Sequence, residues 1–137
     1  SPRRPMRIPA TLAEEVLAHC RAELPNEACG LLAGDDWGVR KVYCLENADR
    51  SPVAYTIDPR GHFEALADAE GNGWDLVGSF HSHVSGPAHP SPTDVRGAAE
   101  PDWVWLVAGP MTGSTELRAF WIRDSRITEE ELEITGG

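Results

Sequence analysis

Two histidines that are two residues apart, His81 and His83, mark the part of the sequence where metal chemistry is expected. They end an apolar run that is typical of a strand, so their side chains leave the same face of that strand. Asp94 follows eleven residues after His83, where its carboxylate can fold back as an oxygen ligand. Two imidazoles and one carboxylate leave one position of a tetrahedral zinc ion open for water, as in catalytic zinc sites. Zinc lowers the pKa of such a water to about 7.

Each of these features also has a purely structural interpretation. A lone His-x-His pair is more often a hydrogen-bonded surface pair than a metal site. Ser91-Pro-Thr-Asp94 is an ordinary helix start, with Ser91 at the N-cap, Pro92 at the first helical position and Asp94 favourable to the helix dipole. Together the pieces read His-Ser-His-x7-Ser-x-x-Asp, with an acidic residue, Glu27, upstream. This combination is far more specific than any of its parts.

The order of Glu27, His81-Ser-His83 and Ser91-Pro-Thr-Asp94 resembles the motif of the JAMM (MPN+) zinc metalloproteases, E…H-[ST]-H-x7-S-x-x-D. The similarity extends beyond the motif to the small prokaryotic members, and most of all to the actinobacterial Mec-type peptidases. The segments that carry it are residues 25–30, 47–52, 100–102 and 116–118. The resemblance covers the chain from about residue 6 to residue 133.

The resemblance implies a role for each matched residue. His81, His83 and Asp94 correspond to the zinc ligands, so one Zn²⁺ per chain is expected. Glu27 corresponds to the acid/base that accepts a proton from the attacking water and delivers it to the leaving amine. Ser91 corresponds to the hydroxyl that hydrogen-bonds the oxyanion.

The implied activity is hydrolysis of an amide bond at the C-terminus of a ubiquitin-like sulfur-carrier protein, with release of cysteine from its diglycine end. One alternative is an isopeptidase or processing protease for another ubiquitin-like protein. A second is a metal-free MPN scaffold that only binds partners, although the chain keeps all three ligand positions. A third, a DNA-associated relative, is disfavoured by the negative net charge and by the lack of a basic cluster.

Several further residues have weaker signals. Val84 departs from the family pattern, in which proline often follows the second histidine, so the loop 84–89 is expected to be a subfamily feature. His89 is expected to be a solvated loop residue rather than a substrate contact. For Cys29, a buried packing role is favoured over contact with a sulfur-bearing substrate. Trp103 and Trp105 alternate along a predicted strand, where packing between sheet and helix is favoured over a docking patch.

These residues need a scaffold, and the hydrophobic pattern predicts one. Helices are expected over 11–24, opened by a Thr11–Glu14 capping box, over 59–70 after Asp58, and over 92–99. The expected strands are 28–33, 39–46, 54–57, 76–80, 103–108, 116–122 and 127–134. Such interleaving predicts a mixed α/β (α+β) domain, and the resemblance narrows this to the MPN/JAMM fold, a central, mostly antiparallel sheet flanked by helices. One domain is expected over 6–134, with tails at 1–5 and 135–137; Gly136-Gly137 is expected to be frayed.

Composition limits the possible partners. Among 137 residues there are 12 Lys+Arg and 22 Asp+Glu, a net charge of −10. This charge disfavours binding to nucleic acid or to a membrane surface, and no apolar run approaches the roughly 18 residues of a membrane span. The three cysteines form no C-x-x-C pair, and no signal peptide is visible. A reduced, cytoplasmic protein is therefore expected.

Overall fold

The computed structural model describes residues 6–136, and its centre is a six-stranded sheet. The strand order is β3–β2–β4–β5–β6–β7. The strands are β2 (Cys29–Asp35), β3 (Gly38–Leu45), β4 (Asp75–Ser82), β5 (Val104–Gly109), β6 (Glu116–Arg123) and β7 (Arg126–Glu130). Only β4 and β5 are parallel neighbours in this sheet, and the other neighbouring pairs are antiparallel. The prediction of a mixed fold with a mostly antiparallel central sheet is confirmed.

A second, two-stranded sheet joins the two ends of the described chain. β1 (Met6–Pro9) pairs in parallel with β8 (Leu132–Thr135). β1 was not predicted from the sequence, and the single strand predicted over 127–134 is wrong. That stretch is divided at Glu131 into β7 and β8, which belong to different sheets. β8 ends at Thr135, one residue beyond the predicted domain limit. The predicted tails 1–5 and Gly137 lie outside the described residues.

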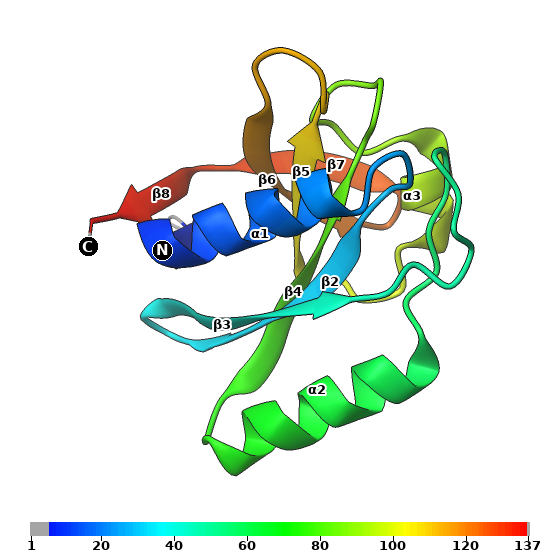
Figure 1. The fold of residues 1–137 in the computed structure, drawn as a ribbon. Coiled ribbons are helices and arrows are strands. Elements are labelled where there is room, and N and C mark those ends of the chain that lie inside the picture. The colour runs from blue at the N-terminus through cyan, green and yellow to red at the C-terminus, as the bar shows by residue number, and fades with distance from the viewer. Residues whose placement is uncertain (1–5, 137) are drawn as a thin grey trace.

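Three helices surround the central sheet. They are α1 (Ala10–Ala22), α2 (Pro59–Gly71) and α3 (Pro92–Gly97). Figure 1 shows α1 and α2 on opposite sides of the β2–β3 pair. The predicted Thr11–Glu14 capping box is wrong, because α1 begins one residue before Thr11, after Pro9, and has no side-chain cap. No helix among residues 6–136 is long and apolar enough to cross a membrane.

The predicted strand over 54–57 is also wrong, and the side chain of Asn47 explains why. This stretch forms only an isolated bridge between Asn47 and Ile57. The buried Asn47 amide instead donates to the carbonyl of Ala54 at 2.8 Å and accepts from the backbone N–H of Thr56 at 3.2 Å. The side chain thereby replaces a strand partner, so the segment 47–57 runs as an ordered loop along the edge of the site.

The alternation of side chains along β4 and β5 creates two faces of the sheet. On one face, Phe80 and Leu106 pack in a core with Val16 of α1. On the other face, Trp105 packs in a second cluster that includes Val95 of α3. The ring of His81 lies edge-on to Trp105, with centroids 6.1 Å apart. His81 therefore leaves β4 on the face opposite α1, where the candidate site lies.

Candidate metal centre and active site

Three predicted ligands converge at the end of β4. His81 Nε2 lies 3.0 Å from Asp94 Oδ2, and His83 Nε2 lies 3.1 Å from the same oxygen. The two Nε2 atoms are 3.2 Å apart, and all three side chains are buried. They are the one group of three or more His, Cys, Asp or Glu residues within residues 6–136 that is arranged to hold a metal ion.

Hydrogen bonds outside this cluster fix how the ligands present their atoms. His83 Nδ1 lies 2.8 Å from the carbonyl oxygen of Pro87, so Nδ1 carries the hydrogen and donates it. The Nε2 atom of His83 then faces Asp94 Oδ2. Two lone pairs in contact would repel one another, so either a proton or a metal ion must lie between these two atoms. The donor set of the site is therefore suited to a metal ion.

The carboxylate of Asp94 is held by the start of α3. The backbone N–H of Ser91 donates to Asp94 Oδ2 at 2.8 Å, and the backbone N–H of Asp94 donates to Ser91 Oγ at 3.1 Å. Ser91 is at the N-cap and Pro92 at the first position, as the sequence predicted, and the reciprocal pair of hydrogen bonds forms a capping box that was not predicted. The first turn of α3 thus fixes the position of the Asp94 carboxylate.

Aromatic rings enclose His81. Tyr55, on the loop 47–57, stacks on its imidazole with centroids 4.6 Å apart and planes 23° apart. Burial disfavours a charge on the imidazole and lowers the pKa of His81. Its Nδ1 is buried and makes no hydrogen bond within the described part of the chain.

The electrostatics of the other two ligands favour an ionised carboxylate. Burial tends to raise the pKa of Asp94, but hydrogen bonds to His81 and His83 outweigh it and hold the pKa well below the usual range. Burial tends to lower the pKa of His83, and the neighbouring Asp94 carboxylate and Pro87 carbonyl raise it overall. The Asp94 carboxylate is therefore ionised and is available to a cation, whether this is the His83 imidazolium or a metal ion.

Glu27 lies just before β2 and is joined to the ligand strand through Ser82. The backbone N–H of Ala28 donates to Ser82 Oγ at 2.8 Å, and the backbone N–H of Ser82 donates to the carbonyl of Ala28 at 3.1 Å. The carbonyl of Glu27 also accepts from the Asn47 side chain at 3.1 Å. Ser82 stands between the two histidines in sequence, so one residue ties Glu27 to the end of β4 that carries them.

The environment of the Glu27 carboxyl makes it a weaker acid than usual. The residue is only 6% exposed. Burial raises its pKa from 4.5 to about 7, with His83 lowering it and Asp94 raising it to smaller extents. A carboxyl group with this pKa exchanges a proton readily near neutral pH.

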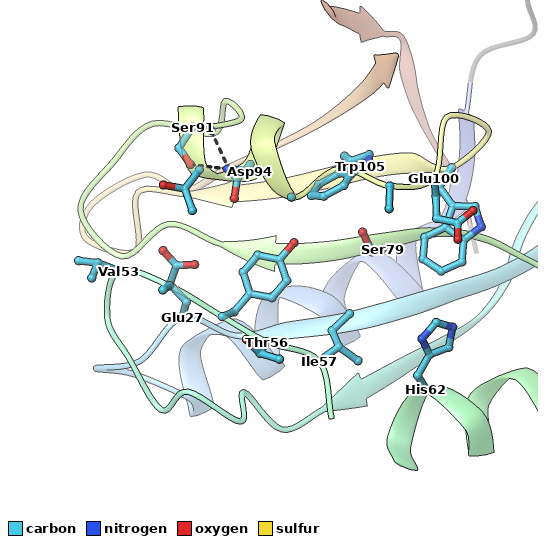
Figure 2. A pocket seen from close by; sticks show the side chains of 16 residues that line it. Glu27, Val53, Thr56, Ile57, His62, Ser79, Ser91, Asp94, Glu100 and Trp105 are labelled. Atoms are coloured by element: carbon cyan, nitrogen blue, oxygen red, sulfur yellow. Dashed lines mark hydrogen bonds between the residues drawn. The ribbon is translucent and has the colours of Figure 1, made fainter. Parts of the chain in front are cut away.

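A cavity of about 430 Å³ extends from this site along the sheet. Figure 2 shows Glu27, Ser91 and Asp94 at one end and His62 with Glu100 at the other. Its walls are rich in aromatic side chains, so we call it the aromatic cavity. The aromatic residues that line it are Tyr55, His62, Trp103 and Trp105.

A second cavity, of about 480 Å³, shares Glu27, Val53 and Ser91 with the first. We call it the proline-walled cavity. Its lining includes Pro52, Pro87, Pro90 and Pro92, together with His83 and His89. The two cavities meet where the candidate catalytic residues lie.

The weaker predictions have different outcomes. His89 is exposed, as expected, although it also lines the proline-walled cavity. Cys29 is buried and its thiol donates to the carbonyl of Glu46 at 3.5 Å, which fits a packing role. Trp105 packs between sheet and helix. Trp103 lies outside β5, at the far end of the aromatic cavity beside His62, so its assignment to the strand is wrong.

Sequence reasoning missed the residues that shape the site without reacting. Tyr55 fell in the stretch interpreted as a strand, and an isolated tyrosine there has no local signal of contact with a histidine 26 positions away. Asn47 begins one of the segments that carried the family resemblance. That resemblance was the available signal, because an Asn in a polar loop is otherwise common.

Comparisons with known proteins identify the family of this chain. Residues 9–123 match the family described as prokaryotic homologs of the JAB domain. The CysO-cysteine peptidase of Mycobacterium tuberculosis is 36% identical over 130 residues, which cover 93% of this chain and 89% of that protein. The probable TtuB-protein conjugate cleaving protease of Thermus thermophilus is 38% identical over 120 residues, 87% of this chain and 77% of that one. A desampylase of Pyrococcus furiosus is 38% identical over 108 residues, 79% and 74% of the two.

Solved structures show the same fold. A protein from Desulfitobacterium hafniense superposes with a TM-score of 0.87 at 38% identity and covers 96% of this chain and 94% of its own. A JAB1/MPN domain protein from Archaeoglobus fulgidus, at 18% identity, superposes with a TM-score of 0.62 over 97% and 99% of the two chains. From the matched family and these relatives, the chain belongs to the prokaryotic JAB-domain family and is a hydrolase of the JAMM type.

Proposed function

We propose that this protein is a zinc-dependent peptidase that cleaves the amide bond after the diglycine end of a ubiquitin-like sulfur-carrier protein and releases cysteine. The observation that carries the proposal is the convergence of His81, His83 and Asp94 at the junction of the two cavities, where Glu27 and Ser91 also lie. The 36% identity to a CysO-cysteine peptidase over 93% of this chain supports this carrier class and leaving group.

The three ligands fit a single zinc ion. Two imidazole nitrogens and one carboxylate oxygen are the donors that catalytic zinc sites use, and they leave a fourth position for water. When bound, zinc would polarise the scissile carbonyl and make a water acidic enough to react near neutral pH. His83 is oriented for this role by Pro87, and Asp94 by the backbone of Ser91.

Glu27 and Ser91 supply the remaining chemistry. Glu27 takes a proton from the attacking water and returns it to the departing nitrogen, a role that suits a carboxyl group whose pKa is raised by burial. The Ser91 oxygen already accepts from the N–H of Asp94, so its own hydrogen is left to donate to the oxyanion. Such a donor contributes up to about 3–4 kcal/mol to stabilisation of the transition state.

The shape of the aromatic cavity supports an extended tail as substrate. A diglycine segment has no side chains, so it can lie close to the rings of Tyr55, Trp103 and Trp105 that line this cavity. The carrier's folded body then lies outside the cavity. We also propose that the protein acts in the cytoplasm, because its three cysteines are free thiols in the structure.

The test is mass spectrometry of a carrier protein that ends in Gly-Gly-Cys, incubated with the zinc-loaded enzyme. We expect the loss of one cysteine residue with wild-type protein and no loss with Glu27→Gln, which keeps the zinc ligands. Unchanged carrier mass with zinc bound would contradict the proposal. Cleavage of a carrier linked to a lysine side chain, in place of the cysteine adduct, would favour the isopeptidase that the Thermus and Pyrococcus relatives suggest.

A further inference from the structure

The proline-walled cavity has no role so far, yet it opens from the reacting centre. It meets the aromatic cavity at Glu27, Val53 and Ser91. A bond cleaved at this junction leaves one half of the substrate in each cavity. If the carrier tail lies in the aromatic cavity, the residue that departs must lie in the proline-walled one.

The loop that forms this second cavity is held in place relative to the metal ligands. The carbonyl of Pro87 accepts from His83 Nδ1 and from the backbone N–H of His89, each at 2.8 Å. The carbonyl of Val84 accepts from the N–H of Met111 at 2.9 Å. His89 therefore has a backbone position fixed by the same oxygen that orients a metal ligand, so the cavity is formed before substrate arrives.

The charges around this cavity single out one side chain. The protein has a net charge of −10, and Glu27 is an acidic residue in the cavity itself, so an anion entering there needs a local donor. Among the described lining residues the basic side chains are His83 and His89. His83 has both ring nitrogens engaged, one with Pro87 and one with Asp94.

Of these two histidines, His89 is the one whose imidazole can bind a ligand. It is exposed, and its ring is steadied edge-on against Phe120, with centroids 5.2 Å apart. Glu129 lies near enough for His89 to lower its pKa, after the larger effect of Arg118, which binds that carboxylate through two nitrogens. Among residues 6–136 the His89 ring makes no hydrogen bond of its own, so a ring N–H is left to donate to a ligand.

We propose that the proline-walled cavity binds the departing amino acid and that His89 recognises its free α-carboxylate. This inference rests on the proposed peptidase function. An amino acid joined through its α-nitrogen has its carboxylate on the same carbon as that nitrogen, so the charge enters this cavity whenever the nitrogen lies beside Glu27. A lysine joined through its side-chain nitrogen has no carboxylate on the carbon next to that nitrogen, so no negative charge enters the cavity there. His89 is thus a specificity-determining residue for single α-linked residues.

The test compares two carrier substrates that differ at one group. One ends in Gly-Gly-Cys with a free carboxylate, and the other ends in Gly-Gly-cysteinamide. A charge-assisted hydrogen bond predicts that the zinc-loaded wild type has a kcat/KM about tenfold higher for the acid. His89→Ala is expected to remove this preference through KM, with kcat retained. His62→Ala, which removes an imidazole from the aromatic cavity, is the matched control and should affect both substrates alike.

A binding measurement that needs no turnover gives a second readout. Chelator-treated protein is titrated with L-serine, which has the backbone of cysteine without its metal-binding thiol, and in parallel with L-serinamide. We expect the NMR signal of the His89 ring to shift with serine and not with serinamide. Equal shifts, or none, would overturn the assignment of His89.

The outcomes separate this inference from the proposed function. Wild-type enzyme that cleaves the acid and the amide equally well leaves the peptidase function standing and overturns the subsite. Zinc-loaded enzyme that cleaves neither overturns the proposed function, and the serine titration then decides whether His89 binds a carboxylate.

Discussion

Replacing Glu27 with glutamine should stabilise the metal-free protein at high pH. The folded state raises the pKa of Glu27 from 4.5 to about 7, so between these values the folded protein binds more protons than the unfolded chain. The free energy of unfolding therefore falls as the pH rises through this window. Below about pH 4.5 both states are protonated and the cost is absent, whereas above about pH 7 it is present in full. Glutamine does not ionise, so the variant avoids this cost.

The magnitude follows from the size of the shift. A difference of about 2.5 pKa units corresponds to at most about 3.4 kcal/mol. Two cavities open at Glu27 and let water hydrate the carboxylate, so we expect about 2 kcal/mol. The assay is urea unfolding of both proteins after chelation, at about pH 4.5 and about pH 8. Chelation is needed because a bound dication would itself favour the ionised carboxylate.

The comparison needs a control for loss of charge alone. Glu15→Gln removes an exposed carboxylate from α1 and should give nearly the same change in unfolding free energy at both pH values. If Glu27→Gln behaves like this control, the carboxylate is not desolvated and the reasoning is wrong. If wild type is the more stable protein at high pH, Glu27 has a favourable partner in the folded state. With zinc bound, Glu27→Gln should be inactive. The substitution would therefore raise the stability of the metal-free protein and abolish the activity of the zinc-loaded one.

Further predictions concern the residues that hold the site. Ser82→Ala removes the acceptor of the Ala28 N–H and should cost about 1–3 kcal/mol in urea unfolding, with Ser82→Thr recovering most of it. Asn47→Asp keeps the acceptor oxygen but removes both side-chain donors, so KM for the carrier should rise while zinc content, measured by metal analysis, stays near one per chain. His83→Ala should abolish zinc binding in the same measurement. A chelator should abolish wild-type activity, and added zinc should restore it. The wild-type rate should increase with pH as Glu27 ionises, and this limb of the profile should lie below about pH 7, because zinc lowers the pKa that burial raises.

The placement of the candidate ligands His81, His83 and Asp94 was predictable from the sequence because their geometry is local. Residues two apart on a strand lie on the same face whatever the rest of the fold is, and the helix start at Ser91, which places Asp94, needs only the first turn of α3. Glu27 is 54 positions from His81, and no periodicity links them. Its assignment depended on the family resemblance, and the structure shows the connection, which is the pair of hydrogen bonds between Ala28 and Ser82.

The parts that were not predictable depend on distant partners. β1 is only four residues long and is held as a strand by its pairing with β8, which is distant in the sequence. Residues 54–57, at the end of the loop 47–57, were predicted to form a short strand, but the Asn47 side chain satisfies backbone groups of this segment instead. The stacking of Tyr55 on His81 follows from that loop. Each of these features is decided by contacts between segments that no short window of sequence contains.

The register of β4 decides where the candidate metal ligands lie and where Glu27 lies relative to them. His81 leaves the strand toward the site, while Ser82, next in the chain, is hydrogen-bonded to Ala28 just before β2 and contacts the Cys20 thiol of α1. A shift of one residue would exchange these faces, because side chains alternate along a strand. Two glycines allow the close packing that this register of β4 requires. A Cβ at Gly30 would collide with the ring of Phe80, and a Cβ at Gly78 would collide with the carbonyl of Val104. The close packing of β2, β4 and β5 that these glycines permit is therefore part of how the site is built.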